Sequence, residues 1–302
     1  MLQVNIFDNT CQHHLKGDGY WTSTLNRKPK DITFKQRLMH YDGITLFTDD
    51  YILSDVVDKV KSKIKIAWCL ESPAVQSMVH NHIHEVESKF DYIFTYRDDL
   101  IKKNPKKFLP NSPGGSYLLD SDMSLYNDVK NKNCSLILSE KQFLPGHSLR
   151  HKIQQTCVGV DFFGRGSYNG FIKNKLTALK NYRFHIVIEN IQMEHYFTEK
   201  LIDCFLAGCI PIYWGAPNIG DYFNKEGILS FNNLNDLSTF KIKKDFLECI
   251  KVSLKENPQY VLYSYLSEED LLLLKSYFKK AKFIDRKSTR LNSSHANISY
   301  AV

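Results

Sequence analysis

The chain has 302 residues, of which 43% are hydrophobic and 13% aromatic, and its formal net charge is +7. This length suggests about two domains of roughly 100–200 residues each. The small charge does not favour nucleic-acid binding and is better suited to a local basic cleft for an anionic small molecule. No apolar run reaches the ~18 residues of a membrane span, and no signal-peptide pattern opens the chain. We therefore expect a cytoplasmic protein without a membrane anchor.

Short apolar strand patterns alternate with helical patterns along the chain. Strands are expected at 2–7, 43–48, 63–70, 90–96, 133–139, 184–190, 210–214 and 227–231. Helices are expected at 31–40, 74–89, 147–157, 170–181, 198–208, 235–252 and 267–282. This alternation predicts an α/β protein with parallel sheets and right-handed crossovers. One eight-stranded sheet fits the pattern, but two open sheets separated by the polar stretch 102–133 fit the length better.

The last residues, 286–302, show neither helical nor strand periodicity. They contain three of the 40 basic side chains and no acidic side chain. The rest of the chain therefore has 37 basic and 33 acidic side chains, a net charge of +4. The segment is similar to translated read-through of a sequencing adapter. We expect it to be a non-native tail and exclude it from the fold.

Polar residues lie at the exit of one strand and at the start of the following helix. Glu189 and Asn190 end the strand 184–190, and Thr198 is placed to cap a helix that begins with Glu199 and Lys200. The free N–H groups and positive dipole end of that helix favour an anion, and Lys200 adds a charge. The alternative is an ordinary solvated first turn.

Arg150 occupies the same topological place one strand–helix unit earlier, after the strand 133–139. Two cations at the carboxyl ends of two parallel strands could clamp a diphosphate, with the arginine binding as a bidentate fork. Alone, Arg150 could equally be a surface residue. The loop "VDFFGRGSYNG" at 160–170, with Gly164, adds a weak glycine-loop signal near the same edge.

The first half of the chain contains one notable carboxylate. Glu71 follows the apolar strand 63–70 and precedes Ser72 and Pro73. At the carboxyl edge of the first sheet it would face a cleft and could serve as a general base. A surface carboxylate that caps the next helix is the alternative.

Three patterns could suggest a metal site, and we favour none of them. The seven cysteines form no CxxC pair, and Cys69, Cys204, Cys209 and Cys249 lie in apolar runs, so we expect reduced core thiols. The "DSD" at 120–122 does not directly follow a convincing strand. The alternating histidines of "VHNHIHEVE", at 80, 82 and 84, lie in a helical pattern that splays them, and we expect them to be solvated.

A long stretch, "FHIVIEN…YFTEKLIDCFLAGCIPIYWGAP", strongly resembles the donor-binding signature of the α-1,3/4-fucosyltransferases, glycosyltransferase family 10. The segments "WCLESPA", "FDYIFTYRDD", "FLPNSPGGSYL" and "SLRHKI…VDFFGRG" resemble other motifs of that family in the same order. The resemblance covers about 64–231. It implies the GT-B fold, two facing Rossmann-like domains with parallel sheets. It also implies an N-terminal acceptor-side domain at 1–130, a GDP-fucose-binding domain at 131–265 and a C-terminal helix at 266–285 that packs back across them.

The resemblance also implies roles for the candidate residues. Arg150 and Lys200 would hold the pyrophosphate of GDP, and Glu71 would deprotonate the acceptor hydroxyl. Asn190, Tyr196 and Glu199 would contact the nucleotide and the fucose, with Glu189 and Gly164 as secondary candidates. The implied reaction is an inverting transfer of L-fucose from GDP-β-L-fucose to a glycan, with an α-1,3 linkage to a GlcNAc-type sugar.

The resemblance leaves other readings open. No cofactor or divalent metal is expected to be essential, because the cations can stabilise the leaving group. The same fold could use another nucleotide sugar, or the chain could be an inactive glycan- or nucleotide-binding homologue. The expected partners are a nucleotide-sugar donor and an oligosaccharide acceptor, and the expected enzyme is of bacterial or viral type. The basic run "KKNPKK" at 102–107 is expected to be a solvated loop, with an acceptor or peripheral membrane contact as the alternative.

Overall fold

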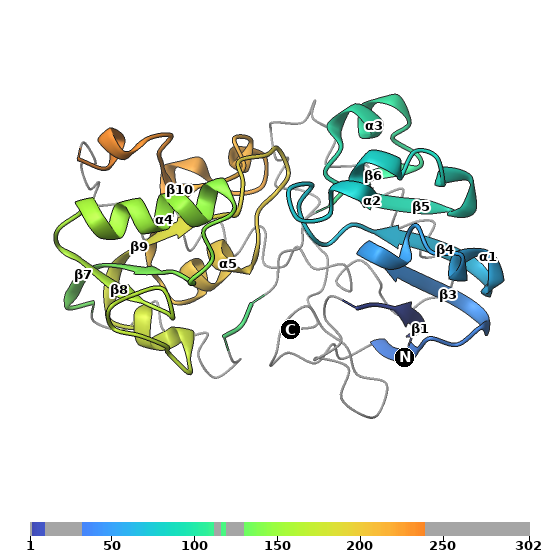
Figure 1. Cartoon of the computed structure of the whole chain (residues 1–302), viewed down its shortest axis with the longest axis horizontal. Coiled ribbons are helices and arrows are strands. Elements are labelled where there is room, and N and C mark those ends of the chain that lie inside the picture. The colour runs from blue at the N-terminus through green and yellow to red at the C-terminus, as the bar shows by residue number, and fades with distance from the viewer. Residues whose placement is uncertain (1, 10–31, 112–115, 119–129, 239–302) are drawn as a thin grey trace, which may run out of the picture. The chain divides into compact units, whose positions relative to one another are not determined.

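The computed structural model of the chain describes residues 2–9, 32–111, 116–118 and 130–238 (Figure 1). These residues fall into two compact units, the first ending at 111 and the second starting at 116. The predicted domain boundaries at 130 and 265 stay predictions. The predicted C-terminal helix at 266–285 and the tail at 286–302 lie outside the described residues.

The first unit is built on a six-stranded sheet in which every pair of neighbouring strands is parallel. The strand order is β2-β1-β3-β4-β5-β6. The strands are β1 (Leu2–Phe7), β2 (Ile32–Gln36), β3 (His40–Thr48), β4 (Lys61–Trp68), β5 (Tyr92–Thr95) and β6 (Phe108–Pro110). The helices are η2 (Asp49–Tyr51), α1 (Val56–Lys59), α2 (Ser77–His82), η3 (Glu87–Lys89) and α3 (Asp98–Lys103).

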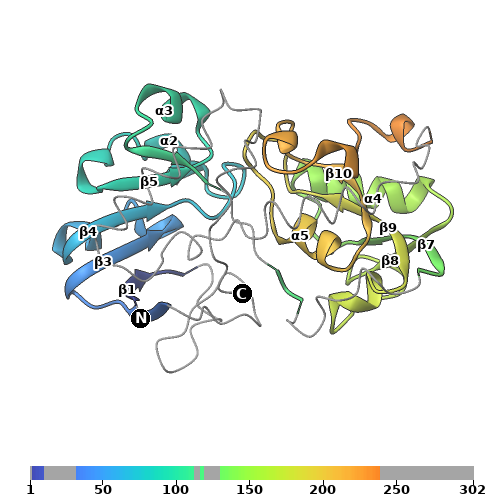
Figure 2. The ribbon, with the colours of Figure 1, turned by 180° about the vertical axis from the view of Figure 1, so that it is seen from behind.

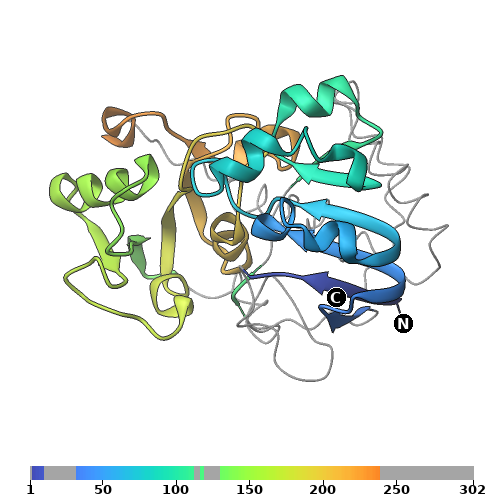
Figure 3. The ribbon, with the colours of Figure 1, turned by 45° about the vertical axis from the view of Figure 1, so that its right-hand side comes forward.

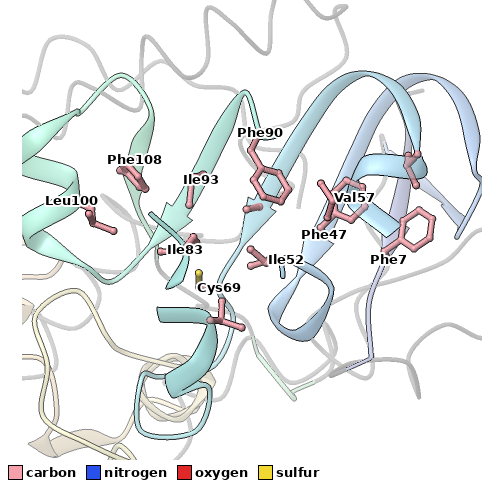
Figure 4. Packing of buried hydrophobic residues seen from close by; sticks show 13 residues of the cluster. Phe7, Phe47, Ile52, Val57, Cys69, Ile83, Phe90, Ile93, Leu100 and Phe108 are labelled. Carbon is pink, nitrogen blue, oxygen red and sulfur yellow. The ribbon is translucent and has the colours of Figure 1, made fainter. Parts of the chain in front are cut away.

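Both faces of this sheet are buried. Successive side chains of a strand alternate between the faces, so Ile66 of β4 joins one buried cluster and its neighbour Ala67 joins the other. In the second cluster, Val57 of α1, Ile83 after α2 and Leu100 of α3 pack with residues of the sheet (Figure 4). This double burial explains why the buried ends of β3 and β4, "ITLFT" and "IAW", are largely apolar runs in the sequence.

Some predicted elements of the first unit are wrong. The helix predicted at 31–40 is instead the edge strand β2, in which Phe34 is buried and pairs in register with Val4 of β1. The strand has only five residues, and Lys35 and Gln36, which follow Phe34, are both exposed. The alternation of buried and exposed side chains that marks a strand is therefore not visible in the sequence. The helix predicted at 74–89 is split into α2 and η3, and the three-residue strand β6 was not predicted.

The second unit is built on a five-stranded parallel sheet of order β11-β10-β9-β7-β8. Its strands are β7 (Lys132–Ile137), β8 (Val160–Phe163), β9 (Tyr182–Ile188), β10 (Ile210–Trp214) and β11 (Leu229–Ser230). Its helices are α4 (Pro145–Thr156), α5 (Glu199–Leu206), η6 (Lys175–Ala178), η7 (Ile219–Asp221), η8 (Lys225–Gly227) and η9 (Leu234–Ser238).

The predictions for this unit are largely confirmed. Four of its strands and the helices α4 and α5 form where the periodicity placed them. The predicted helix at 170–181 is reduced to the single turn η6, and β8 forms inside the stretch interpreted as a glycine loop. The predicted helix at 235–252 begins as η9, and its remainder, like the helix at 267–282, lies outside the described residues.

The strand order of the second unit defines where a ligand can bind. From β7 the chain passes through α4 to β8 on one side, and it then continues on the other side of β7 with β9, α5 and β10 (Figures 1 and 2). Right-handed crossovers in opposite directions place α4 and α5 on opposite faces of the sheet (Figure 3). The order therefore reverses between β7 and β9, and α/β sheets bind ligands at the carboxyl ends of such strands.

Three further predictions concern the surface and the thiols. Every helix within the described ranges is too short or too polar to cross a bilayer. The basic run is exposed at 102–106, where α3 ends, as predicted. Cys69, Cys204 and Cys209 are buried free thiols, also as predicted, whereas Cys249 lies outside the described residues.

Candidate active site

A buried carboxylate organises the carboxyl end of β9. Glu189 follows β9 directly and is completely buried. Its carboxylate accepts hydrogen bonds from the backbone N–H of Thr198 (2.8 Å) and from the Thr198 hydroxyl (2.7 Å). These bonds close the loop 190–197 onto the strand that precedes it. Glu189, a secondary candidate in the sequence, is therefore the acceptor that holds the start of α5 in place.

Thr198 caps α5 as predicted. Its backbone is extended, with φ −129° and ψ −174°, and its hydroxyl oxygen accepts the N–H of Lys200 at 3.4 Å. A threonine at this position satisfies one of the donors that the first helical turn leaves without a partner.

Lys200 lies at the centre of this arrangement. Its ammonium donates to the Thr198 hydroxyl oxygen (2.8 Å) and pairs with Glu199 (3.4 Å) and Glu189 (3.5 Å). About 29% of the side chain is exposed, so the ammonium can still reach a ligand. The interpretation of this turn as an ordinary solvated one is wrong, because Glu189, its partner, is fully buried.

Arg150 reaches the same place from α4. It is buried, and its guanidinium donates to the carbonyl oxygen of Ile188 and to the side-chain oxygen of Asn190 (3.4 Å). Burial lowers the pKa of Arg150, although Glu189 and Glu199 oppose that shift. The geometry confirms the prediction that α4 and α5 bring Arg150 and Lys200 to neighbouring strand ends. The interpretation of Arg150 as a surface residue is wrong.

A close backbone contact fixes α4 against the end of β9. The N–H of Gly146 donates to the carbonyl oxygen of Asn190 at 2.9 Å. A Cβ atom at position 146 would lie 1.8 Å from the carbonyl oxygen of Glu189. Any other residue would push the first turn of α4 away from the strand, and Arg150 would move with it.

Two further residues lie beside Arg150 and Thr198. His147, in the first turn of α4, is buried, and burial together with Arg150, Lys141 and Lys200 lowers its pKa to about 4. It is therefore neutral at neutral pH. Tyr196 is also buried, two residues before Thr198 in the loop closed by Glu189.

The sequence reasoning missed a third cation, Lys175, and a third carboxylate, Asp203, at this end of the sheet. The ammonium of Lys175, in η6, pairs with Asp203 (2.8 Å) and Glu199 (3.3 Å) and lies 4.3 Å from the ring centroid of Tyr117. Asp203 is buried and accepts hydrogen bonds from the Ser116 hydroxyl (2.7 Å) and the Tyr117 N–H (2.8 Å). No local pattern marks Lys175, but the lone acid inside the apolar run "LIDCFL" could have drawn attention to Asp203.

We define the charged cluster as six side chains. Ion pairs connect Lys175, Glu189, Glu199, Lys200 and Asp203, and the sixth is Arg150, whose charged form Glu189 and Glu199 favour. Burial alone would raise the pKa of Glu199, but Lys200, Lys175 and the Thr198 hydroxyl outweigh it and lower the pKa to about 2. Burial alone would lower the pKa of Lys175, but Asp203 and Glu199 raise it instead. Both groups are therefore charged at neutral pH. Cations and helix N-termini at adjacent strand ends are suited to binding a diphosphate.

Gly164 has a structural role at the edge of the same sheet. Its φ is +97°, and a Cβ atom there would lie 2.2 Å from the carbonyl oxygen of Leu138. Its N–H donates to the carbonyl oxygen of Gly170 at 2.9 Å and closes the turn after β8. The predicted glycine turn is confirmed, and it packs on the residue after β7.

In the first unit, Glu71 lies on the loop after β4, as predicted, and is half-buried. The side chain of Asp49 accepts the N–H groups of Leu70 (2.8 Å) and Glu71 (3.2 Å). On the other side, the His80 ring nitrogen Nε2 bonds the carbonyl oxygen of Glu71 at 2.9 Å. The loop that carries Glu71 is therefore held by side chains from η2 and α2.

The structure describes the three alternating histidines but not the "DSD" sequence. His80 is buried, so the expectation that it is solvated is wrong, whereas the side chains of His82 and His84 are 43% and 49% exposed to solvent. The helix α2 separates His80 from His82, as expected of a helical pattern. The "DSD" at 120–122 lies outside the described residues.

The chain was compared with known families and proteins. A sequence model of "Glycosyltransferase family 10 (fucosyltransferase) C-term" matches residues 128–286. The alpha-(1,3)-fucosyltransferase FucT of Helicobacter pylori is 39% identical over 77 residues, which are 26% of this chain and 16% of that protein. The 4-galactosyl-N-acetylglucosaminide 3-alpha-L-fucosyltransferase 9 of Bos taurus is 22% identical over 251 residues, 77% of this chain and 66% of that one.

The match to the Helicobacter protein therefore spans about a sixth of its length. Among solved structures, an α1,3-fucosyltransferase with GDP superimposes with a TM-score of 0.51 and 17% identity, over 95% of this chain and 89% of that chain. A second α1,3-fucosyltransferase structure gives a TM-score of 0.51 and 18% identity over 85% and 81%. This likeness shows the fold: the predicted GT-B type, with two parallel-sheet α/β regions, is confirmed.

Proposed function

Because this chain belongs to glycosyltransferase family 10, the fucosyltransferases, we propose that it transfers L-fucose from GDP-β-L-fucose to a hydroxyl group of a glycan. The observation that carries the proposal is the convergence of Arg150 and Lys200 on the carboxyl end of β9. A solved α1,3-fucosyltransferase with GDP shares this fold. Its low identity makes the donor and the acceptor of this chain part of the proposal.

In the proposed donor complex, Arg150 and Lys200 bind the two phosphates of GDP. The guanidinium already lies 3.4 Å from the Asn190 oxygen, and a phosphate could replace that weak contact with a stronger charge-assisted bond. Asn190, Tyr196 and Glu199 would contact the nucleotide and the sugar. The N–H groups at the start of α5 would add a partial positive charge.

In the proposed reaction, Glu71 is the base. It removes the proton of the acceptor hydroxyl while that oxygen attacks the anomeric carbon, and the bond to GDP breaks on the opposite face, which inverts the configuration. A positioned carboxylate base typically contributes about 10²–10⁴-fold to the rate. Asp49 and His80 form hydrogen bonds with the Glu71 backbone, which supports this role, because a base must be held in place to act. We propose an α-1,3 linkage to a GlcNAc-type sugar.

We further propose that no divalent metal is essential. In this proposal Arg150 and Lys200 would face the leaving diphosphate, and fixed positive charges of this kind stabilise a transition state in which negative charge develops. A cytoplasmic location and a peripheral membrane contact stay predictions.

The test is release of GDP from GDP-fucose, with and without N-acetyllactosamine, in EDTA. We expect release that the acceptor stimulates, that survives EDTA and that falls at least 100-fold in Lys200→Ala and in Glu71→Ala. The exposed residues Lys173 and Glu140 provide matched controls, and Lys173→Ala and Glu140→Ala should keep wild-type rates.

Titration with GDP separates the alternatives. Glu71→Ala should bind GDP like the wild type, and Lys200→Ala should bind at least tenfold more weakly. Tight GDP binding without turnover would point to another donor sugar, another acceptor or an inactive homologue. Absence of GDP binding by the wild type would overturn the donor site itself.

A further inference from the structure

Lys175, with its partner Asp203, has a place in the charged cluster that neither the sequence motifs nor the proposed reaction explains. It lies in η6, between β8 and β9, and reaches the first turn of α5 from outside that helix. Its ammonium pairs with Asp203 (2.8 Å) and Glu199 (3.3 Å), and 27% of its side chain is exposed. A lysine held by two carboxylates in this way is fixed in position rather than free to follow a ligand.

Because Lys200 also contacts Glu199, binding of a diphosphate at Lys200 would change the charges around Glu199. Lys200 pairs with Glu189 and Glu199 and donates to Thr198. If its ammonium turns to a diphosphate, its contact with Glu199, at 3.4 Å, weakens. Glu199 would then face an incoming anion with one cation fewer, and a neighbouring negative charge favours the protonated form of a carboxyl group.

From this geometry we propose that Lys175 is a positioning residue that keeps Glu199 ionised and in place while Lys200 binds the diphosphate. The inference rests on the proposed function, since it takes the anion at Lys200 to be the donor diphosphate. Lys175 itself would not touch the donor. It acts through Glu199, and Asp203 holds it there.

Asp203 makes this arrangement rigid. Its carboxylate accepts two hydrogen bonds from Ser116 and Tyr117, and the ring of Tyr117 lies under the Lys175 ammonium. Asp203 and the Tyr117 ring thus hold the Lys175 ammonium beside Glu199. Little conformational freedom is then lost in keeping the Lys175–Glu199 pair when the donor binds.

All charged groups that face Glu199 enter this argument. They are Lys175 from η6, Arg150 from α4, Glu189 at the end of β9, and Lys200 and Asp203 on α5 itself. Lys175 and Lys200 are the two cations in direct contact with Glu199, and together they hold its pKa at about 2, against the effect of burial. Removal of Lys175 should therefore raise that pKa by about 1–3 units, the range typical of one nearby opposite charge.

The test is the pH profile of kcat/KM for GDP-fucose between pH 4 and pH 8 in the wild type, Lys175→Met and Lys175→Arg. If the pKa of Glu199 rises to about 5, we expect the activity of Lys175→Met relative to the wild type to fall about twofold at pH 5 and about tenfold at pH 4, mainly through the KM of the donor. Lys175→Arg should restore most of the loss, because it keeps the charge. Lys173→Met, an exposed lysine two residues earlier, is the matched control and should follow the wild-type profile.

A double-mutant cycle separates positioning from a merely structural role. If Lys175 acts through Glu199, Lys175→Met should add no pH dependence to Glu199→Gln. Lys175→Met also leaves the buried Asp203 without its cation, so Lys175→Met/Asp203→Asn is the second variant. Its amide oxygen can still accept from Ser116 and Tyr117, and it should fold yet keep the altered profile.

The outcomes are distinct. A wild type that neither binds GDP nor releases it overturns the proposed function and the inference with it. A wild type that works, with folded Lys175 variants that show the wild-type profile, overturns the inference alone. A lower melting temperature with no change in the profile would make Lys175 a structural residue and overturn the inference as well.

Discussion

Glu189→Gln tests whether the buried carboxylate at the end of β9 organises the site. The substitution keeps the size of the side chain but replaces one oxygen with an NH₂ group, which can only donate. Oε1 of Glu189 accepts the Thr198 N–H, and Oε2 faces the Thr198 hydroxyl (2.7 Å) and the Lys200 ammonium (3.5 Å). An amide can serve one of these two positions as an acceptor, but not both.

The expected loss of stability can be worked out from these contacts. Hydrogen bonds to a charged group contribute about 1.5–3 kcal/mol each. One such bond is lost, the second becomes a bond between neutral groups, and Lys200 loses a weak partner. We expect the free energy of unfolding to fall by about 2–4 kcal/mol, and the affinity for GDP to fall at least tenfold because the start of α5 is no longer fixed.

The assay combines urea unfolding with hydrogen exchange of peptides that span 189–206. The faster exchange should be confined to these peptides, since local unfolding starts where the contacts are lost. Glu140→Gln makes the same chemical change at an exposed site and should have an effect of less than about 0.5 kcal/mol. A loss below that value in Glu189→Gln, with unchanged exchange, would refute the reasoning.

Three other predictions concern single contacts. Gly146→Ala should lower the free energy of unfolding by about 1–3 kcal/mol and weaken GDP binding in a calorimetric titration, because its Cβ would lie 1.8 Å from a carbonyl oxygen. Gly220→Ala is the control and should be neutral, because its Cβ would meet nothing closer than 3.5 Å. The pKa of Glu199 is lowered to about 2 in the folded chain, so its ionisation stabilises the fold above about pH 4.5 and this stability is lost as the pH falls toward 2. Urea unfolding at pH 5 and pH 3 should show a smaller change in Glu199→Gln than in the wild type. Asp49→Ala removes the acceptor of two N–H groups on the Glu71 loop, so kcat should fall at least tenfold while GDP affinity stays unchanged.

The parts of the fold that follow from local pattern could be predicted from the sequence. Most strands of the two sheets lie in apolar runs long enough to be recognised, and the Thr198 cap is a local signal between residues close in sequence. The edge strands β2, β6 and β8 have three to five residues each, too few for a period to show. They form because a neighbouring strand offers free hydrogen-bonding groups, which is a tertiary effect.

The candidate site was predictable where its residues follow strands. Glu189, Arg150 and Lys200 could be placed at one sheet edge by topology alone. Lys175 could not, because its partner Glu199 lies 24 residues away and the helical pattern at 170–181 does not show which group the lysine contacts. The burial of His80 was missed for a related reason, since its partner is a backbone carbonyl group, at Glu71, that no sequence pattern marks.

The charged cluster has a consequence for how fast a nucleotide can arrive. Its three basic side chains, Arg150, Lys175 and Lys200, are matched in number by three acidic ones, Glu189, Glu199 and Asp203, so the cluster has no formal excess of positive charge to attract an anion from a distance. Long-range attraction accelerates association only where a surface carries unbalanced charge, and it is screened beyond ~10 Å at 0.1 M salt. GDP should therefore reach this site by ordinary diffusion, at a rate that ionic strength hardly changes, and be retained by directed hydrogen bonds after it arrives.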